Sequence, residues 1–145
     1  NYNYYVERYQ KHENYNYRFF KVSYKNKLLL FLVIRNVNYN NHGALRIIDS
    51  FGNWSSLRGL GYILKQLTIN EKKEYIDFLY HGPNSKYIEL NGFLKKSPKN
   101  IIPDYFEPFK GIKNQPLNYC YKYSEEYCLH KGDADSDRPN ILIKS

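Results

Sequence analysis

The feature that most constrains the fold is an apolar strand, an amphipathic helix and a second apolar strand that follow one another between Ala44 and His81. The runs at 44–50 and 74–81 have the length and the β-branched or aromatic content of strands. Two strands joined by a helix lie parallel in one sheet, and the crossover is right-handed in nearly all proteins. Ligands of such sheets bind outside the carboxyl ends of the strands. The pattern therefore predicts a site where Asp49 and His81 end their strands.

The crossover helix is expected over residues 55–72, with Ser55 or Ser56 as its N-cap. Its apolar and small residues recur at the spacing of one helical face, which is the amphipathic pattern. They are Leu57, Leu60, Gly61, Leu64 and Leu67.

The remaining elements complete a sheet. Apolar runs at 18–24 and 28–37 are separated by Lys25-Asn26-Lys27, which predicts an antiparallel hairpin that continues into 44–50. A short helix at 85–91 and short strands at 93–96 and 117–123 follow. The order predicts one α/β domain over residues 1–145, with a mixed central sheet, an antiparallel meander before the strand–helix–strand crossover, and helices on the faces.

Composition limits the partners and the location. A formal net charge of +8 favours an anionic partner, although the same charge also serves solubility. The apolar run at 28–34 is too short to span a bilayer. Cys120 and Cys128 are too few for a disulfide framework, so we expect a cytoplasmic protein with reduced thiols and no membrane span. The chain begins at Asn1 without Met, and we expect it to be part of a longer protein or processed.

The start of the crossover helix offers a phosphate site. Arg58-Gly59-Leu60-Gly61 lies where free backbone N–H groups and the helix dipole favour an anion. The pyrophosphate of coenzyme A would suit this position, with Arg58 adding charge. The alternative is an exposed arginine beside two glycines that pack the helix.

The order of elements and two short motifs resemble those of the GNAT acetyltransferase superfamily. In that family this loop has the pattern Gln/Arg-x-x-Gly-x-Gly/Ala, where x is any residue. Arg58 and Gly61 match the pattern, and Ile63 stands where the last Gly or Ala belongs. The family's later helix usually ends in the pattern Tyr-x-x-x-Gly-Phe. Gly92 and Phe93 match the end of this pattern, and Ile88 stands where Tyr belongs.

A closer resemblance is to GNAT-like proteins encoded with bacterial surface-polysaccharide genes. It implies a donor that is acetyl-CoA or another acyl-CoA, and an acceptor amino or hydroxyl group on a sugar. It also implies a partner domain or a homodimer, since such proteins often carry this unit after another half. The resemblance lies in residues 8–12, 46–49, 74–78, 102–109 and 132–140.

The candidate catalytic residues are Asp49 and His81. Acyl transfer needs a base for the acceptor proton; histidine suits neutral pH, and burial can tune an aspartate upward. Asp49 is expected on the same face of its strand as Leu45 and Ile47. The alternative is a capping aspartate and a surface histidine.

The later part of the chain offers acceptor contacts. Tyr105 and Glu107, in an aromatic loop with two prolines, and Asp135 and Arg138, in a polar loop, could contact a sugar. Aromatic loops also simply cover the edge of a core.

No metal is expected. The run 133–137 copies the first half of a calcium loop, but Arg138 stands where that loop needs Gly. Cys120, Cys128 and His130 lack a zinc spacing.

Three functions stay open. The first is an enzyme, an N- or O-acyltransferase of the GNAT type that acts on a sugar or surface-glycan precursor. The second is a non-catalytic GNAT-like module that packs on a partner or binds a glycan. The third is nucleic-acid binding, which no recognised RNA-binding motif supports.

Overall fold

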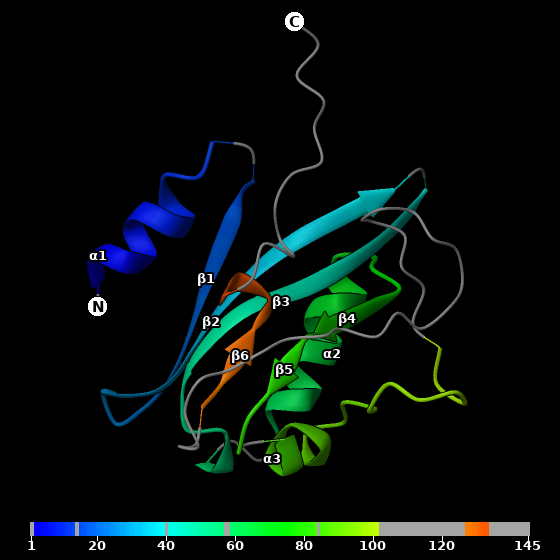
Figure 1. Cartoon of the computed structure of the whole chain (residues 1–145). Coiled ribbons are helices and arrows are strands. Elements are labelled where there is room, and N and C mark those ends of the chain that lie inside the picture. The colour runs from blue at the N-terminus through cyan, green and yellow to red at the C-terminus, as the bar shows by residue number, and fades with distance from the viewer. Residues whose placement is uncertain are drawn as a thin grey trace, which may run out of the picture.

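The computed structural model describes residues 2–13, 15–39, 41–56, 59–83, 85–101 and 127–133. The helices and strands follow one another along the chain (Figure 1) in this order: α1 (Tyr2–Tyr5), a π-helix (Val6–Gln10), β1 (Tyr17–Tyr24), β2 (Lys27–Tyr39), β3 (His42–Gly52), a 3-10 helix (Trp54–Ser56), α2 (Leu60–Asn70), β4 (Tyr75–Phe78), β5 (Tyr80–His81), α3 (Ser85–Leu90), β6 (Leu129–His130) and a second 3-10 helix (Lys131–Asp133). Within these ranges, no helix has both the length and the apolar character that crossing a membrane requires.

A four-stranded sheet in the order β1-β2-β3-β4 forms the centre of the molecule. The first three strands are antiparallel, and β4 joins β3 in parallel after α2. The predicted mixed α/β class, the meander and the parallel pair are therefore confirmed. Lys25 and Asn26 join β1 to β2 with φ of 46° and 62°, the left-handed geometry that matches the twist of a two-residue hairpin.

Three predicted elements differ from the structure. The helix predicted over 55–72 is interrupted: α2 begins only at Leu60, because Gly59 has a left-handed φ of 93° that a helix interior does not allow. The strand predicted over 74–81 is divided into β4 and β5, and residues 93–96 do not form a strand. The strand predicted over 117–123 lies outside the described residues.

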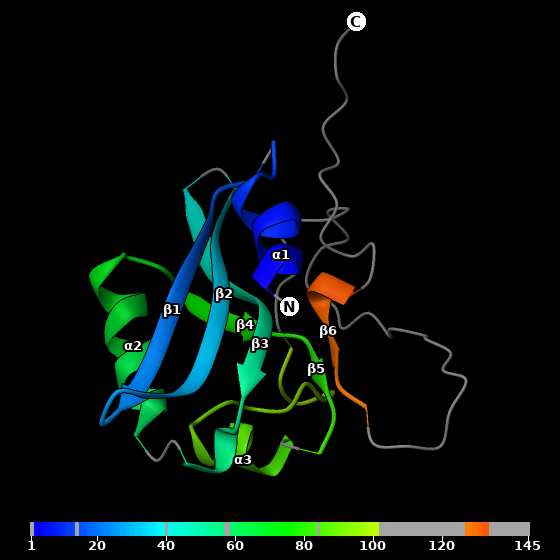
Figure 2. The same ribbon diagram turned by 90° about the vertical axis from the view of Figure 1, so that its left-hand side faces the viewer.

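Helices cover both faces of the sheet, as Figure 2 shows with α1 and α2 on opposite sides. The main core lies between the sheet and α2, and its buried residues are Leu30, Leu32, Ile34, Leu45, Ile47, Trp54, Leu60, Leu64 and Ile88. A smaller core lies under the N-terminal helices and is built from Tyr9, Tyr17, Val33 and Ile48. Tyrosine side chains thus form the buried contact between the N-terminal helices and the sheet.

An irregularity in β3 reverses the predicted direction of Asp49. Ile34 pairs with Ile47, but the next residue back, Val33, pairs with Asp49, so Ile48 is an extra residue in the ladder. Opposed residues share a face of a sheet, and Val33 belongs to the smaller core. The prediction that Asp49 shares a face with Ile47 is therefore wrong, and Asp49 lies on the α1 face.

Candidate functional site

The carboxyl-terminal half of β3 extends past the end of β4. The β4 strand pairs only with residues 44–47 of β3, and β3 continues to Gly52. Residues 129–133, in β6 and the 3-10 helix after it, contact this part of β3, and β6 pairs antiparallel with β5 (Figure 1). The edge where the sequence predicts a site is therefore shared by segments far apart along the chain.

Asp49 is the centre of a buried polar cluster at this edge. Its side chain is 8% exposed. The Tyr9 hydroxyl donates to Asp49 Oδ2 at 2.9 Å, and the Ser50 backbone N–H donates to Oδ1 at 2.7 Å. The Nδ1 atom of His130 lies 3.5 Å from the same Oδ1. We call Tyr9, Asp49, Ser50, His130 and Asp133 the Asp49 cluster.

The His130 ring is fixed in this cluster on all sides. Its Nε2 lies 2.9 Å from Ser50 Oγ, and its Nδ1 lies 3.3 Å from Asp133 Oδ2. The His130 backbone N–H also donates to Asp133 Oδ2 at 2.8 Å. The ring stacks on Phe78 at 5.8 Å and meets Tyr80 edge-on at 5.3 Å. With Nδ1 between two carboxylates and Nε2 at a hydroxyl, the network favours a proton on Nδ1.

Burial sets the protonation behaviour of the cluster. It raises the pKa of the Asp49 carboxyl, while a charged His130 and the hydrogen bond from Tyr9 offset part of this increase. Burial and the Asp49 carboxylate raise the pKa of Tyr9 well above its usual range, so Tyr9 remains a neutral donor. Burial alone would raise the pKa of Asp133, but hydrogen bonds from His130 lower it below its usual value.

The N-terminal segment closes the cluster from the α1 face. The Arg8 guanidinium donates through Nη2 to the carbonyl oxygen of Gly132. A Cβ at Gly132 would collide with the Tyr9 hydroxyl and come within 3.2 Å of Ile48 Cγ2. Only glycine allows this close approach, so the packing of residues 131–133 and the position of the Tyr9 hydroxyl depend on each other.

The structure separates the two predicted catalytic residues. Asp49 lies in the buried cluster, whereas His81 is exposed, pairs with Leu129 and stacks on Tyr127 at 5.4 Å. The histidine against Asp49 is His130, which sequence reasoning considered only as a zinc ligand. Tyr9 was also missed as a member of the site, because it precedes Asp49 by 40 positions and no local pattern connects the two residues.

The predicted phosphate-binding residues have different surroundings. Arg58 lies outside the described residues, and Leu60 is buried in the main core. The Gly61 N–H donates to Asn91 Oδ1 at 3.2 Å, and a Cβ on Gly61 would overlap the Asn91 backbone. The Tyr62 N–H donates to the Gly59 carbonyl at 3.1 Å. Gly61 thus packs the start of α2 against the end of α3. This agrees with the alternative that a glycine of this loop serves to pack the helix.

The other predicted contacts belong to the later part of the chain. Tyr105, Glu107, Asp135 and Arg138 lie outside the described residues. Within the ranges that the structure describes, no group of three or more His, Cys, Asp or Glu residues is arranged to hold a metal ion.

Comparison of the chain with protein-family models, curated proteins and solved structures gives no match. The function is therefore argued from the residues and the geometry of the site.

Proposed function

We propose that this chain is a GNAT-like acyltransferase that moves an acyl group from acyl-coenzyme A to an amino or hydroxyl group of a sugar or surface-glycan precursor. The observation that carries the proposal is the buried Asp49 carboxylate, held between Tyr9 and His130 at the carboxyl end of β3. The parallel pairing of β3 with β4 ends at Ile47 and Phe78, two residues before Asp49, and ligands of crossover sheets bind near the carboxyl ends of such strands.

The cluster provides a base for the acceptor proton. Burial raises the pKa of Asp49, which makes the ionised carboxylate a stronger base than an exposed one. The acceptor transfers its proton to the Tyr9 oxygen as Tyr9 transfers its own to Asp49 Oδ2. The acceptor nitrogen or oxygen then bonds to the thioester carbonyl carbon, and the carbon–sulfur bond breaks. The departing thiolate takes up the proton that Asp49 has accepted, so Asp49 is again ionised and no net proton stays on the protein.

His130 acts as a positioning residue in this scheme. Its Nδ1 faces Asp49 Oδ1 while Ser50 and Asp133 fix the ring. This arrangement keeps the second carboxylate oxygen occupied, so that Oδ2 faces Tyr9. The donor phosphates are assigned to the segment 58–61, following the family resemblance and the favourable end of the α2 dipole, although the Gly61 N–H already donates to Asn91 Oδ1.

The donor is tested by isothermal titration of acetyl-CoA. The wild type and Lys65→Ala should bind, and Arg58→Ala should bind more weakly. Lys65 is exposed in α2, so Lys65→Ala is a matched loss of one positive charge. Absence of binding by a folded wild-type sample would overturn the acyltransferase proposal.

The base is tested by acetyl transfer to a panel of amino sugars. Asp49→Asn and Tyr9→Phe should lower kcat by roughly 10²–10⁴-fold and leave acetyl-CoA affinity unchanged. His130→Gln should displace the pH profile of kcat as well as lower kcat, because it changes the charge beside Asp49. If His81→Gln abolishes transfer while Asp49→Asn does not, the assignment of the base to Asp49 is wrong.

A second function is favoured by a specific observation, namely that two family positions are already used in packing. The Gly61 N–H donates to Asn91, and Ile88, where the family has Tyr, is 6% exposed in the main core. These contacts suit a non-catalytic module that packs on a partner domain or a second subunit, or that binds a glycan. Such a module would bind no acetyl-CoA, so the titration separates the two functions.

A further inference from the structure

The turn between β1 and β2 and the neighbouring end of β3 form an exposed surface that is both basic and apolar. Figure 1 shows this turn projecting at one end of the sheet. We call this surface the hairpin patch, and its residues are Lys21, Tyr24, Lys25, Lys27, Leu28 and Phe51. We propose that the hairpin patch binds the surface of a bilayer that contains anionic lipids. This binding goes beyond the proposed acyl transfer and does not depend on it.

The charge of the hairpin patch is positive, and the surrounding sequence does not neutralise it. No Asp or Glu occurs over residues 14–48, so the whole β1–β2 hairpin lacks carboxylates. Three of its lysines are exposed, and the ion pairs among the described residues include none of them: Lys21, Lys25 and Lys27. Each lysine close to an anionic membrane surface strengthens binding about fivefold. The charge of the patch therefore complements anionic headgroups.

Apolar side chains are exposed around these lysines. Tyr24 is 64% exposed, Leu28 is 46% exposed and Phe51 is 65% exposed. Single exposed apolar residues are common on proteins, but these three lie at the same end of the sheet as the three lysines. Lysine stems lie along apolar surface while their ammonium groups stay in water, and tyrosine is enriched at the level of lipid headgroups. The combination suits the boundary between headgroups and acyl chains.

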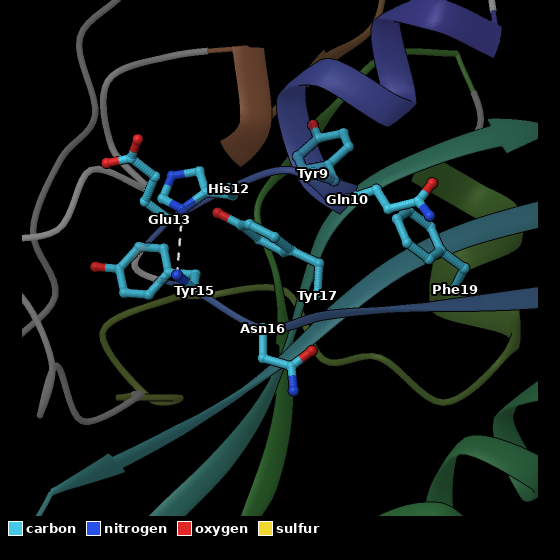
Figure 3. A pocket seen from close by; sticks show the side chains of 8 residues that line it. All are labelled: Tyr9, Gln10, His12, Glu13, Tyr15, Asn16, Tyr17 and Phe19. Carbon is cyan, nitrogen blue, oxygen red and sulfur yellow. Dashed lines mark hydrogen bonds between the residues drawn. The ribbon is translucent and has the colours of Figure 1, made fainter.

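The register of the sheet brings Lys21 and Phe51 to one face. Lys21 is opposite Phe31, and Phe31 is opposite Phe51, so the three residues form a row across β1, β2 and β3. Figure 2 shows the N-terminal helices towards the end of the sheet that is away from the β1–β2 turn. Figure 3 shows Phe19 on the side of Gln10, the last residue of the π-helix. Lys21 follows Phe19 by two residues towards the turn, and both ends of the row remain exposed.

The rings near the patch favour a bilayer over a single strand of nucleic acid. Bases stack on the faces of aromatic rings. Here Lys25 Nζ lies 5.4 Å from the centre of the Tyr24 ring, and Phe19 stacks on Phe31 at 5.7 Å. Leu28 offers no ring, whereas insertion among headgroups needs only exposed apolar area. A second copy of the chain is a poor partner, because it would bring two sets of lysines together.

Cosedimentation of the chain with vesicles tests the proposal. The chain should bind vesicles of phosphatidylglycerol and phosphatidylcholine in equal parts, and it should bind vesicles of phosphatidylcholine alone much more weakly. Joint substitution Lys21→Gln, Lys25→Gln and Lys27→Gln should weaken binding to the mixed vesicles roughly 10²-fold. Phe51→Ala should weaken it about fivefold, because less apolar area enters the bilayer. Equal binding to both kinds of vesicle, or to neither, would overturn the proposal.

Matched variants separate the hairpin patch from the net charge of the chain. Joint substitution Lys86→Gln, Lys95→Gln and Lys96→Gln removes the same charge from exposed positions in and after α3, and Leu90→Ala truncates a side chain that is 73% exposed. At ~0.1 M salt, where the Debye length is about 10 Å, both controls should stay within about threefold of the wild type. An equal loss in the two triple-lysine variants would overturn the patch. Far-UV circular dichroism checks that every variant is folded.

An added tryptophan reports which surface enters the bilayer. Tyr24→Trp places it in the patch, and Tyr62→Trp places it on α2, where Tyr62 is 69% exposed; Trp54 stays buried in both. Mixed vesicles should shift the emission of Tyr24→Trp to shorter wavelength and leave that of Tyr62→Trp unchanged, and the reverse pattern would overturn the patch. Binding to labelled oligothymidylate that needs the three lysines, without binding to vesicles, would overturn the membrane in favour of nucleic acid.

Discussion

The hydroxyl group of Tyr9 should stabilise the fold as well as the site, and Tyr9→Phe measures its contribution. The substitution removes one oxygen and keeps the ring, which contacts Tyr17 edge-on at 5.0 Å. The lost hydrogen bond is 2.9 Å long, and it joins residues that are 2% and 5% exposed. Hydrogen bonds to charged groups contribute about 1.5–3 kcal/mol, so the free energy of unfolding should fall by about 2 kcal/mol at neutral pH.

Urea unfolding followed by tryptophan fluorescence measures this loss. Trp54 is the only tryptophan and is 1% exposed, so its emission should shift to longer wavelength when the chain unfolds. With a urea m value of about 1–3 kcal/mol/M, the midpoint should fall by roughly 0.7–2 M. Tyr62→Phe is the control, because Tyr62 is 69% exposed, and it should change stability by less than about 0.5 kcal/mol.

The pH dependence identifies the partner of the hydroxyl. The Tyr9 hydrogen bond stabilises the ionised form of Asp49, so Tyr9→Phe raises the pKa of Asp49 further above its usual value. A raised folded-state pKa means that the contribution of Asp49 to stability is present at low pH and is lost as pH rises through that pKa. The deficit of Tyr9→Phe should therefore be small near pH ~3, where Asp49 is protonated in both states, and grow towards pH 7. Equal deficits at both pH values, or no deficit at pH 7, would refute the bond to an ionised carboxylate.

Three further stability predictions use the same urea assay. Gly61→Ala places a methyl group against the Asn91 backbone and should cost about 1–3 kcal/mol, whereas Ile63→Ala on the exposed side of α2 should cost less than about 0.5 kcal/mol. Asp77→Asn removes the charge that pairs with the buried Arg46 guanidinium at 2.8 Å and should cost about 3–5 kcal/mol; a loss below 1 kcal/mol would contradict a buried ion pair there. The hydrogen bond from Arg18 lowers the pKa of Glu71, so this carboxylate stabilises the fold above its unfolded pKa of about 4.3, and the contribution is lost as pH falls through the folded value. Glu71→Gln should thus be less stable than the wild type at pH 7 and equal to it at low pH, and a gap that persists at low pH would contradict the pairing.

Hydrophobic pattern predicts the sheet because β2 and β3 bury apolar runs, and β1 shows a partial alternation beside them. It fails where a single residue changes the geometry. Ile47 and Ile48 are both apolar, so nothing in the sequence says which of them is the extra residue in the ladder, yet that choice turns Asp49 to the α1 face. The start of α2 fails for a similar reason, since the helical spacing extends upstream of Gly59 and conceals its left-handed φ.

The site is harder to predict than the fold because its members come from three distant segments. His130 follows its Ser50 partner by 80 positions and lies in a strand of two residues, too short to show any periodicity. The prediction of Asp49 rested on the rule for strand ends, which holds in any crossover sheet. The same rule also predicted His81 as a member of the site. Only the pairing of β5 with β6 shows that the histidine beside Asp49 is His130, from β6.

The N-terminal helices are required for the site more than for the main core. Among the described residues, the buried members of the main core all come from residues 30–88, whereas Tyr9 belongs to the smaller core on the α1 face. Tyr9 supplies the hydroxyl at Asp49, and Arg8 donates to the carbonyl of Gly132 beside it. Without this segment Asp49 would lose its buried donor and gain water, and the burial that raises its pKa would be reduced. The raised pKa of Asp49 therefore depends on the same few N-terminal residues that close the cluster.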